Sequence, residues 1–153
     1  MSTTRVGRRI RAPRATVYRA LLDPDAVARW RFPTGMTPTV HEFDAREGGR
    51  FRVSLTYDAP TDTGKTSAQT DTYHGHFVEL VPDEKVVEEL EFETDAPEHR
   101  GVMTMTTTLA AADEETDVLV VHEGIPVGVA PEDNELGTRL ALDNLAELVE
   151  PAD

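Results

Sequence analysis

The sequence of 153 residues contains no cysteine, and this absence excludes disulfide bonds, thiol catalysis and cysteine-bound zinc. Lysine is scarce as well, since Lys65 and Lys85 are the only two, and Trp30 is the single tryptophan. No apolar run approaches the roughly 18 residues that a membrane-spanning helix needs, so we expect no membrane insertion. The first residues lack the apolar core of a secretory signal, and we therefore expect a cytoplasmic protein.

The net charge of −14 is distributed unevenly along the chain. Residues 1–52 hold eleven arginines and five acidic residues, whereas residues 53–153 hold four basic and 24 acidic residues. The acidic bulk repels nucleic acid, so we expect no nucleic-acid partner. For the basic N-terminal segment, pairing with the acidic remainder across strands is favoured over a phosphate-binding patch. Length and composition are typical of one globular domain, which we assign to residues 1–153.

The spacing of apolar residues predicts one short strand, two small helices, six further strands and a long closing helix. Asp23 and Pro24 are typical of the cap and first turn of the second helix. A turn over 32–35 and a polar loop over 58–70 are expected as well. Strands are predicted over 6–11, 39–44, 50–57, 73–81, 85–93, 102–110 and 117–124, and helices over 13–22, 24–30 and 132–150. The last strand is apolar on both faces, so the sequence does not decide which of them points inward.

This order of elements predicts the α+β class, with a curved antiparallel sheet that grips the C-terminal helix and leaves a cavity between them. The apolar side of the closing helix is predicted from Leu136, Leu140, Leu145 and Leu148. A cavity of this kind suits the binding of an apolar molecule.

Four passages of the sequence resemble a known family in their order along the chain. They are 11–18 with 21–24 and Trp30, then 43–51, then 73–82, and finally Gly137 with 142–145. Together they are similar to the START-related, birch-pollen-allergen-like superfamily (SRPBCC), and within it to the branch of heat-shock-protein-90 ATPase activator homologues. The resemblance implies a helix-grip fold in which six to seven strands wrap around a long C-terminal helix, with two short helices after the first strand.

The resemblance has one visible departure in the closing helix. That helix commonly reads Gly-Trp in the family, whereas Thr138 follows Gly137 here. The missing aromatic leaves this end of any cavity roomier or differently filled. The fold is shared by proteins of many functions, so the resemblance alone does not carry a function over.

The predicted inward faces of the strands and of the closing helix supply candidates for an apolar lining. They are Phe51, Val53, Leu55, Tyr73, Phe77, Leu90, Phe92, Met103, Met105, Leu136 and Leu140. Each of these side chains alternatively fills the core without touching a ligand. Trp30 is expected either as a wall at the cavity mouth or as a core anchor at the end of its helix.

Two polar residues are candidates for the same cavity. Strand alternation places Glu88 on the inner face with Leu90, where a carboxylate is costly unless it is paired. It either binds a polar ligand group or acts as an acid, or it pairs with an arginine such as Arg52 or Arg100, or a slip in strand register exposes it. His122 ends the last strand near the predicted rim and is either an acid or base, or a hydrogen-bonded structural residue.

The sequence offers little support for a metal site, a serine hydrolase or a phosphate-binding loop. His74 and His76 share one strand face, but two histidines alone do not define a metal site, and we predict none. The Gly-x-Ser-x-Gly pattern of serine hydrolases is absent, as are phosphate-binding glycine loops. No cofactor and no catalytic residue are therefore assigned.

The leading hypothesis is a protein that binds a small hydrophobic or amphipathic ligand between the sheet and the C-terminal helix. A cyclase-like or hydrolase-like enzyme that uses Glu88 and His122 is the first alternative, and we favour a protein without enzymatic activity. A chaperone-related protein-interaction module is the second alternative. A homodimer is compatible with such a sheet.

Overall fold

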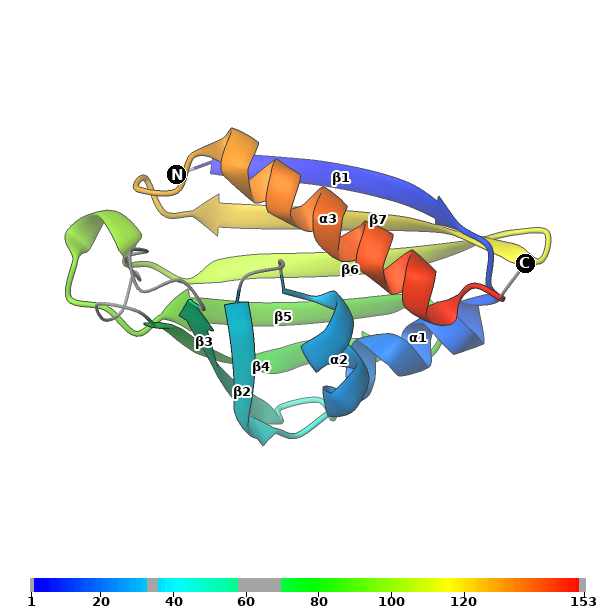
Figure 1. Ribbon diagram of the computed structural model, residues 1–153, viewed down its shortest axis with the longest axis horizontal. Coiled ribbons are helices and arrows are strands. Elements are labelled where there is room, and N and C mark those ends of the chain that lie inside the picture. The colour runs from blue at the N-terminus through cyan, green and yellow to red at the C-terminus, as the bar shows by residue number, and fades with distance from the viewer. Residues whose placement is uncertain (1, 33–35, 58–69, 152–153) are drawn as a thin grey trace.

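A seven-stranded antiparallel sheet forms the frame of the protein, and its helices lie against one face (Figure 1). The computed structural model describes residues 2–32, 36–57 and 70–151. The strands are β1 (Ser2–Ile10), β2 (Met36–Phe43), β3 (Arg50–Tyr57), β4 (Thr70–Val81), β5 (Lys85–Phe92), β6 (Met103–Ala112) and β7 (Glu115–Ile125). The helices are α1 (Arg14–Leu22), α2 (Pro24–Trp30) and α3 (Pro131–Val149), with a short 3-10 turn at Pro97–His99.

The strand order β1-β7-β6-β5-β4-β3-β2 places the first two strands at opposite edges of the sheet. Helix α3 crosses the sheet diagonally, and α1 and α2 lie beside its C-terminal half (Figure 1). The predicted α+β helix-grip architecture is thus confirmed. The turn predicted over 32–35 and the loop predicted over 58–70 lie outside the described residues, except for Phe32 and Thr70.

The predicted element boundaries are confirmed closely where a local signal marks them. The carboxylate of Asp23 accepts a hydrogen bond from the backbone N–H of Asp25 at 2.9 Å, and Pro24 lies in the first turn of α2. Strand β1 differs, because it begins at Ser2 rather than at residue 6. Its early residues pair with the end of β7, where Ser2 lies opposite Ile125, and this pairing leaves no mark in local periodicity.

Alternation along the strands separates the core from the outer face. On β5 the buried side chains are Val86, Glu88 and Leu90, as the sequence predicts. On β7, whose inward face the sequence left open, Val118 and Val120 are buried. The inner face of β7 therefore continues to His122, two residues beyond Val120.

Helix α3 presents smaller residues to the sheet than predicted. Its buried residues are Thr138, Ala141, Leu142, Leu145 and Ala146. Leu136 and Leu140 are 54% and 44% exposed, so their predicted inward orientation was wrong. Leucines lie around much of the circumference of this helix, and their spacing alone therefore did not identify the stripe that faces the sheet.

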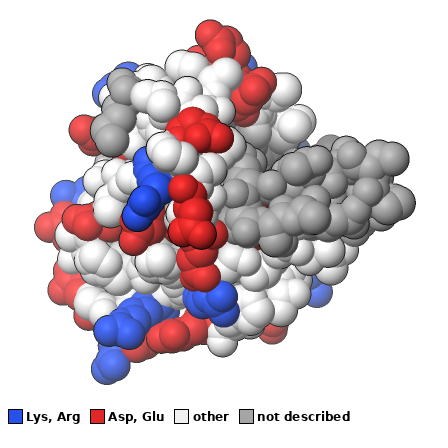
Figure 2. Space-filling model, turned by 90° about the vertical axis from the view of Figure 1, so that its left-hand side faces the viewer, with Lys and Arg blue, Asp and Glu red and all other residues white. Residues whose placement is uncertain are grey.

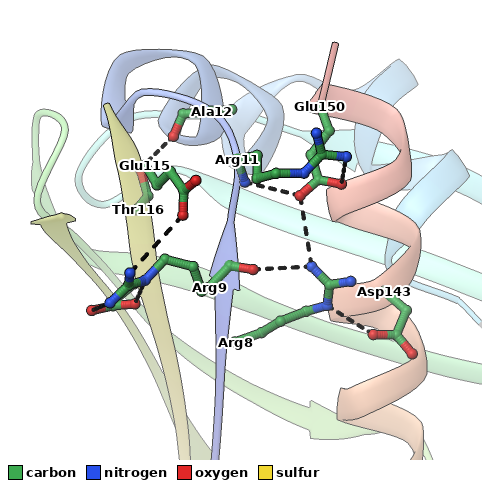
Figure 3. Close-up of polar contacts among 9 residues, drawn as sticks. Arg8, Arg9, Arg11, Ala12, Glu115, Thr116, Asp143 and Glu150 are labelled. Carbon is green, nitrogen blue, oxygen red and sulfur yellow. Dashed lines mark hydrogen bonds and ion pairs between the residues drawn. The ribbon is translucent and has the colours of Figure 1, made fainter. Parts of the chain in front are cut away.

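Polar contacts tie the C-terminal half of α3 and the residue after it to the end of β1 and the residue after it (Figure 3). The Arg8 guanidinium donates to Asp143 at 2.9 Å, and the backbone N–H of Arg11 donates to Glu150 at 2.9 Å. Arg9 pairs with Asp117 on the neighbouring strand β7. The predicted pairing of the basic N-terminal segment with the acidic remainder is thus confirmed for these arginines.

Acidic and basic groups are also interspersed elsewhere on the surface. Seen from the side on which α3 begins, acidic side chains run down the middle of the molecule with basic groups beside them (Figure 2). Such mixing lets opposite charges offset one another locally, while the net charge of −14 remains. Among the described residues, no helix is both long and apolar enough to cross a membrane.

Candidate ligand-binding cavity

A cavity of about 520 Å³ lies between the inner face of the sheet and α3. The end of α2 closes one side, and residues 128–130, just before α3, close another. Eight of the fourteen predicted site residues line it: Trp30, Leu55, Tyr73, Leu90, Phe92, Met103, Met105 and His122. The sequence therefore predicted much of the wall that the sheet contributes.

The other six predicted residues lie elsewhere. Phe51, Val53 and Phe77 are buried in the core, where the rings of Phe51 and Phe77 meet edge to face at 5.3 Å between centroids. Glu88 is buried under the end of α2 and does not line the cavity. Leu136 and Leu140 lie on the outward side of α3, away from the cavity.

The wall that the helices contribute was mostly missed from the sequence. Arg31, Phe32, Asn134 and Thr138 line the cavity, and none of them was assigned to the site. Thr138, which replaces the usual family tryptophan, indeed faces the cavity. The signal that could have led to Arg31 is Glu88, since an inward carboxylate needs a cation within reach.

A buried ion pair between Arg31 and Glu88 lies at the wall of the site. One guanidinium nitrogen, Nη1, donates to Oε1 of Glu88 at 2.8 Å, and the two side chains are 12% and 5% exposed. The expected partners Arg52 and Arg100 are thereby corrected to Arg31, which follows α2 directly. Arg52 instead donates to Glu93 on the outer face of the sheet.

Two further contacts hold the Arg31 guanidinium in place. Its second terminal nitrogen, Nη2, points at the sulfur of Met105 at 3.3 Å, and its central carbon lies 5.8 Å from the centre of the Tyr73 ring. Burial is the largest single influence and by itself lowers the pKa of Arg31, but the charge of Glu88, the neighbouring Tyr73 and the hydrogen bond to Glu88 together hold that pKa above its usual value. Arg31 therefore carries its positive charge inside the protein.

A polar row crosses the inner face of the sheet beneath this ion pair. Glu88 on β5 lies opposite Met105 on β6, and Met105 lies opposite His122 on β7. Thr4 on β1 follows His122 in the row, and its hydroxyl donates to the side-chain oxygen of Asn134 on α3. The row thus runs from the ion pair to the closing helix.

His122 is neutral at physiological pH. Burial and the nearby charge of Arg31 lower its pKa from 6.5 to about 4. Its Nδ1 atom is buried and finds no hydrogen-bond partner among the described residues. A structural histidine normally has both ring nitrogens paired or solvated, so this ring is held by packing rather than by its own hydrogen bonds.

Trp30 is anchored by a hydrogen bond, and Tyr73 packs against the rings of Phe32 and Phe51. Burial raises the pKa of Tyr73, so its hydroxyl keeps its proton at neutral pH. The indole N–H of Trp30 donates to the carbonyl of Ala20 at 2.9 Å, which fixes the ring between α1 and the cavity. Trp30 therefore fills both of the roles that the sequence left open.

A second hollow lies on the outer face of the sheet and is lined mostly by charged and histidine residues. His74 there contacts the carboxylates of Glu91 and Glu93 at 3.1 and 3.0 Å. Hydrogen bonds from Arg52 and then His74 lower the pKa of Glu93. Within residues 2–32, 36–57 and 70–151, no group of three histidine or acidic side chains has the arrangement of a metal site.

Sheet, closing helix and cavity together define a helix-grip protein. Residues 11–150 match the family described as Activator of Hsp90 ATPase homolog 1-like protein, and the chain belongs to this family. Members of the wider fold superfamily commonly bind hydrophobic ligands.

Among solved structures, protein CV1439 from Chromobacterium violaceum is 38% identical, with a TM-score of 0.86 over 99% of this chain and 100% of the other. A protein from Rhodobacter sphaeroides is 18% identical, with a TM-score of 0.79 over 96% and 91% of the two chains. Ms6760 from Mycobacterium smegmatis is 16% identical, with a TM-score of 0.73 over 99% and 92%. The latter two likenesses show the fold alone. Among curated proteins, none matches the chain.

Proposed function

We propose that the protein binds a small apolar or amphipathic molecule in the cavity between the sheet and α3. The cavity itself carries this proposal, because about 520 Å³ lies within the range of roughly 300–1,000 Å³ that small-molecule sites occupy. Most of its lining is aromatic or aliphatic, with a few polar groups that would orient a ligand. Met103 and Met105 supply flexible side chains that adapt to the shape of a guest.

Burial of apolar surface would drive the binding. Each buried methylene contributes about 0.8 kcal/mol, so a chain of about ten carbons gains on the order of 8 kcal/mol before association costs are subtracted. Dissociation constants in the micromolar range or weaker are therefore expected for simple chains. Trp30 lies on the wall and provides a fluorescence signal for occupancy.

The enzyme alternative draws less support from the same residues. Its proposed acid, Glu88, is held by Arg31 at 2.8 Å and does not face the cavity. A neutral His122 could still take part in proton transfer, but no second acid–base group is paired with it in the described part of the chain. Binding without chemistry is therefore the function that we put forward.

Native mass spectrometry on protein purified from its own host tests the proposal first. A mass above that of the denatured chain, carried by a releasable small molecule, is the expected result. Decanoate, decylamine and methyl decanoate then serve as probes in a thermal-shift and Trp30 fluorescence titration. At least one of these chains is expected to raise the melting temperature in a concentration-dependent way.

Gly137 offers a matched pair of variants for this test. It lines the cavity, and a Cβ atom added there meets no heavy atom of the described residues within 4 Å. Gly137→Leu therefore fills cavity space and should abolish the shift, whereas Gly137→Ala adds one methyl and should keep it. Equal responses of the two variants, or no response of the wild type to any probe or native ligand, would refute binding in this cavity.

A further inference from the structure

Arg31 and His122 both line the cavity, and each offers a hydrogen-bond donor that has no strong acceptor among the described residues. Arg31 donates a hydrogen bond from Nη1 to Glu88, but its Nη2 points only at the Met105 sulfur, at 3.3 Å. A thioether is a weak acceptor, so an N–H group that points at it readily bonds to an oxygen atom instead. Met105 is also the cross-strand neighbour of His122, and the charge of Arg31 acts on the His122 ring, so the two side chains belong to the same part of the wall.

The tautomer of His122 follows from the surroundings of its ring. Nδ1 is buried and has no partner in the described residues. A buried N–H without an acceptor is rarer and costlier than a buried lone pair without a donor. The single proton of the neutral ring therefore belongs on Nε2. His122 lines the cavity, so this Nε2–H group is the one that a ligand can meet.

The charge balance of the wall decides which acceptor fits. Arg31 is the one positively charged side chain that lines the cavity among the described residues, and Glu88 already compensates it. Asp71 and Asp133, the other charged side chains of this lining, are acidic. A ligand carboxylate would thus find no uncompensated positive charge in the cavity, and it would still lose its hydration, which costs free energy. At Nη2 of Arg31 and Nε2 of His122, an ammonium group would meet donors instead of acceptors.

We propose that the cavity selects amphiphiles whose polar end is a neutral carbonyl-type oxygen, which accepts hydrogen bonds from Nε2 of His122 and Nη2 of Arg31 beside Met105. This inference rests on the proposed function, since it names the ligand class of the same cavity. The apolar remainder of the ligand then lies along the aromatic and methionine lining. The Arg31–Glu88 pair polarises the carbonyl without attracting a free anion.

Three probes of equal chain length test this selection. Titration of the protein with methyl decanoate, decanoate and decylamine at pH 7 measures one neutral ester, one anion and one cation. Methyl decanoate is expected to bind at least about tenfold more tightly than either of the others, which corresponds to about 1.4 kcal/mol. Binding of decanoate or decylamine that equals or exceeds that of the ester would overturn the inference and leave the proposed function intact.

A pair of His122 variants separates the donor from the bulk of the side chain. In His122→Gln the amide N–H reaches about as far as Nε2 of the imidazole, whereas in His122→Asn the amide ends near the position of Nδ1. The ester preference should survive in the glutamine variant and fall about fivefold or more in the asparagine variant, as expected for a lost hydrogen bond. An unchanged preference in His122→Asn would contradict the assignment.

Nitrogen-15 NMR of the histidine side chains reports the tautomer directly, with His122→Gln identifying the His122 signals. A neutral ring with its proton on Nε2 is expected at pH 7. A proton on Nδ1, or a doubly protonated ring, would overturn the inference whatever the ligands do. If none of the three probes binds, the selection for a neutral carbonyl fails, and native mass spectrometry decides the proposed function separately.

Discussion

Arg31 and Glu88, 57 positions apart in the sequence, form an ion pair of 2.8 Å in the interior, where the end of α2 meets the middle of β5. The pair lies between the core and the cavity and joins the helical layer to the sheet. Burial makes each charge dependent on the other, because neither has water to replace its partner. The first prediction follows from this dependence.

Removal of Arg31 alone should destabilise the protein strongly. Arg31→Met leaves the Glu88 carboxylate buried without its cation, and we expect a loss of about 3–5 kcal/mol in the free energy of unfolding. The double variant Arg31→Met with Glu88→Leu should recover most of this loss, since no unpaired charge remains. Urea denaturation measures both effects.

The exposed pair of Arg46 and Asp44 provides the control, because the Arg46 side chain is 77% exposed. Arg46→Ala should cost less than about 1 kcal/mol. If Arg31→Met costs no more than Arg46→Ala, the Arg31–Glu88 pair is not buried in solution.

The stability of the protein should depend on pH through His122. Its pKa is about 4 in the folded protein and 6.5 when unperturbed, so the unfolded chain binds a proton that the folded protein refuses between these values. Stability therefore falls as the pH falls from about 6.5 to about 4, by up to roughly 3 kcal/mol from this group. Above about pH 6.5 His122 is neutral in both the folded and the unfolded protein, and the stability is no longer reduced by this group.

Comparison with His122→Gln isolates this effect from the carboxylates that titrate in the same range. Glu88, Asp71, Asp133, Arg31 and Tyr73, the other titratable groups around the cavity, are retained in the variant. Urea midpoints recorded from pH 4 to pH 7 should fall more steeply for the wild type than for the variant. Parallel curves would show that His122 has an ordinary pKa.

Two glycines should respond to alanine in opposite directions. A Cβ atom at Gly75 on β4 would lie 2.8 Å from Cζ of Phe51 and still closer to the carbonyl oxygen of Glu89. Gly75→Ala should therefore cost about 3 kcal/mol or more, since backbone would have to move.

Gly137→Ala, by contrast, enters open space on a helix and should gain roughly 0.5–1 kcal/mol from the lower flexibility of alanine in the unfolded chain. Thermal unfolding of both variants checks the pair. A stabilised Gly75→Ala protein would contradict the close approach of β4 and β5 at this position.

The orientation of α3 predicts which of its leucines matter for stability. Leu145 is fully buried, whereas Leu136 is 54% exposed. Leu145→Ala should lower the free energy of unfolding by about 2–5 kcal/mol, and Leu136→Ala by no more than about 0.5 kcal/mol. Chemical denaturation of the two variants would contradict this orientation if their losses were similar.

Local patterns in the sequence were sufficient for much of the fold. The alternation along β5 placed Glu88 on the inner face, and Asp23 with Pro24 marked the start of α2. These signals work because the side-chain period of a strand and the capping of a helix depend on neighbours within a few residues. Most of the lining that β3 to β6 contribute, including Met105, followed from the same alternation.

The sequence by itself thus determined the class of fold, the order of its elements and the inward faces of most strands. Tertiary structure decided the side of α3 that meets the sheet, the inward face of β7 and the choice of Arg31 as partner of Glu88. These three depend on how distant segments approach one another. A helix with leucines around much of its surface, a strand apolar on both faces and an inward carboxylate each allow more than one partner until packing selects one.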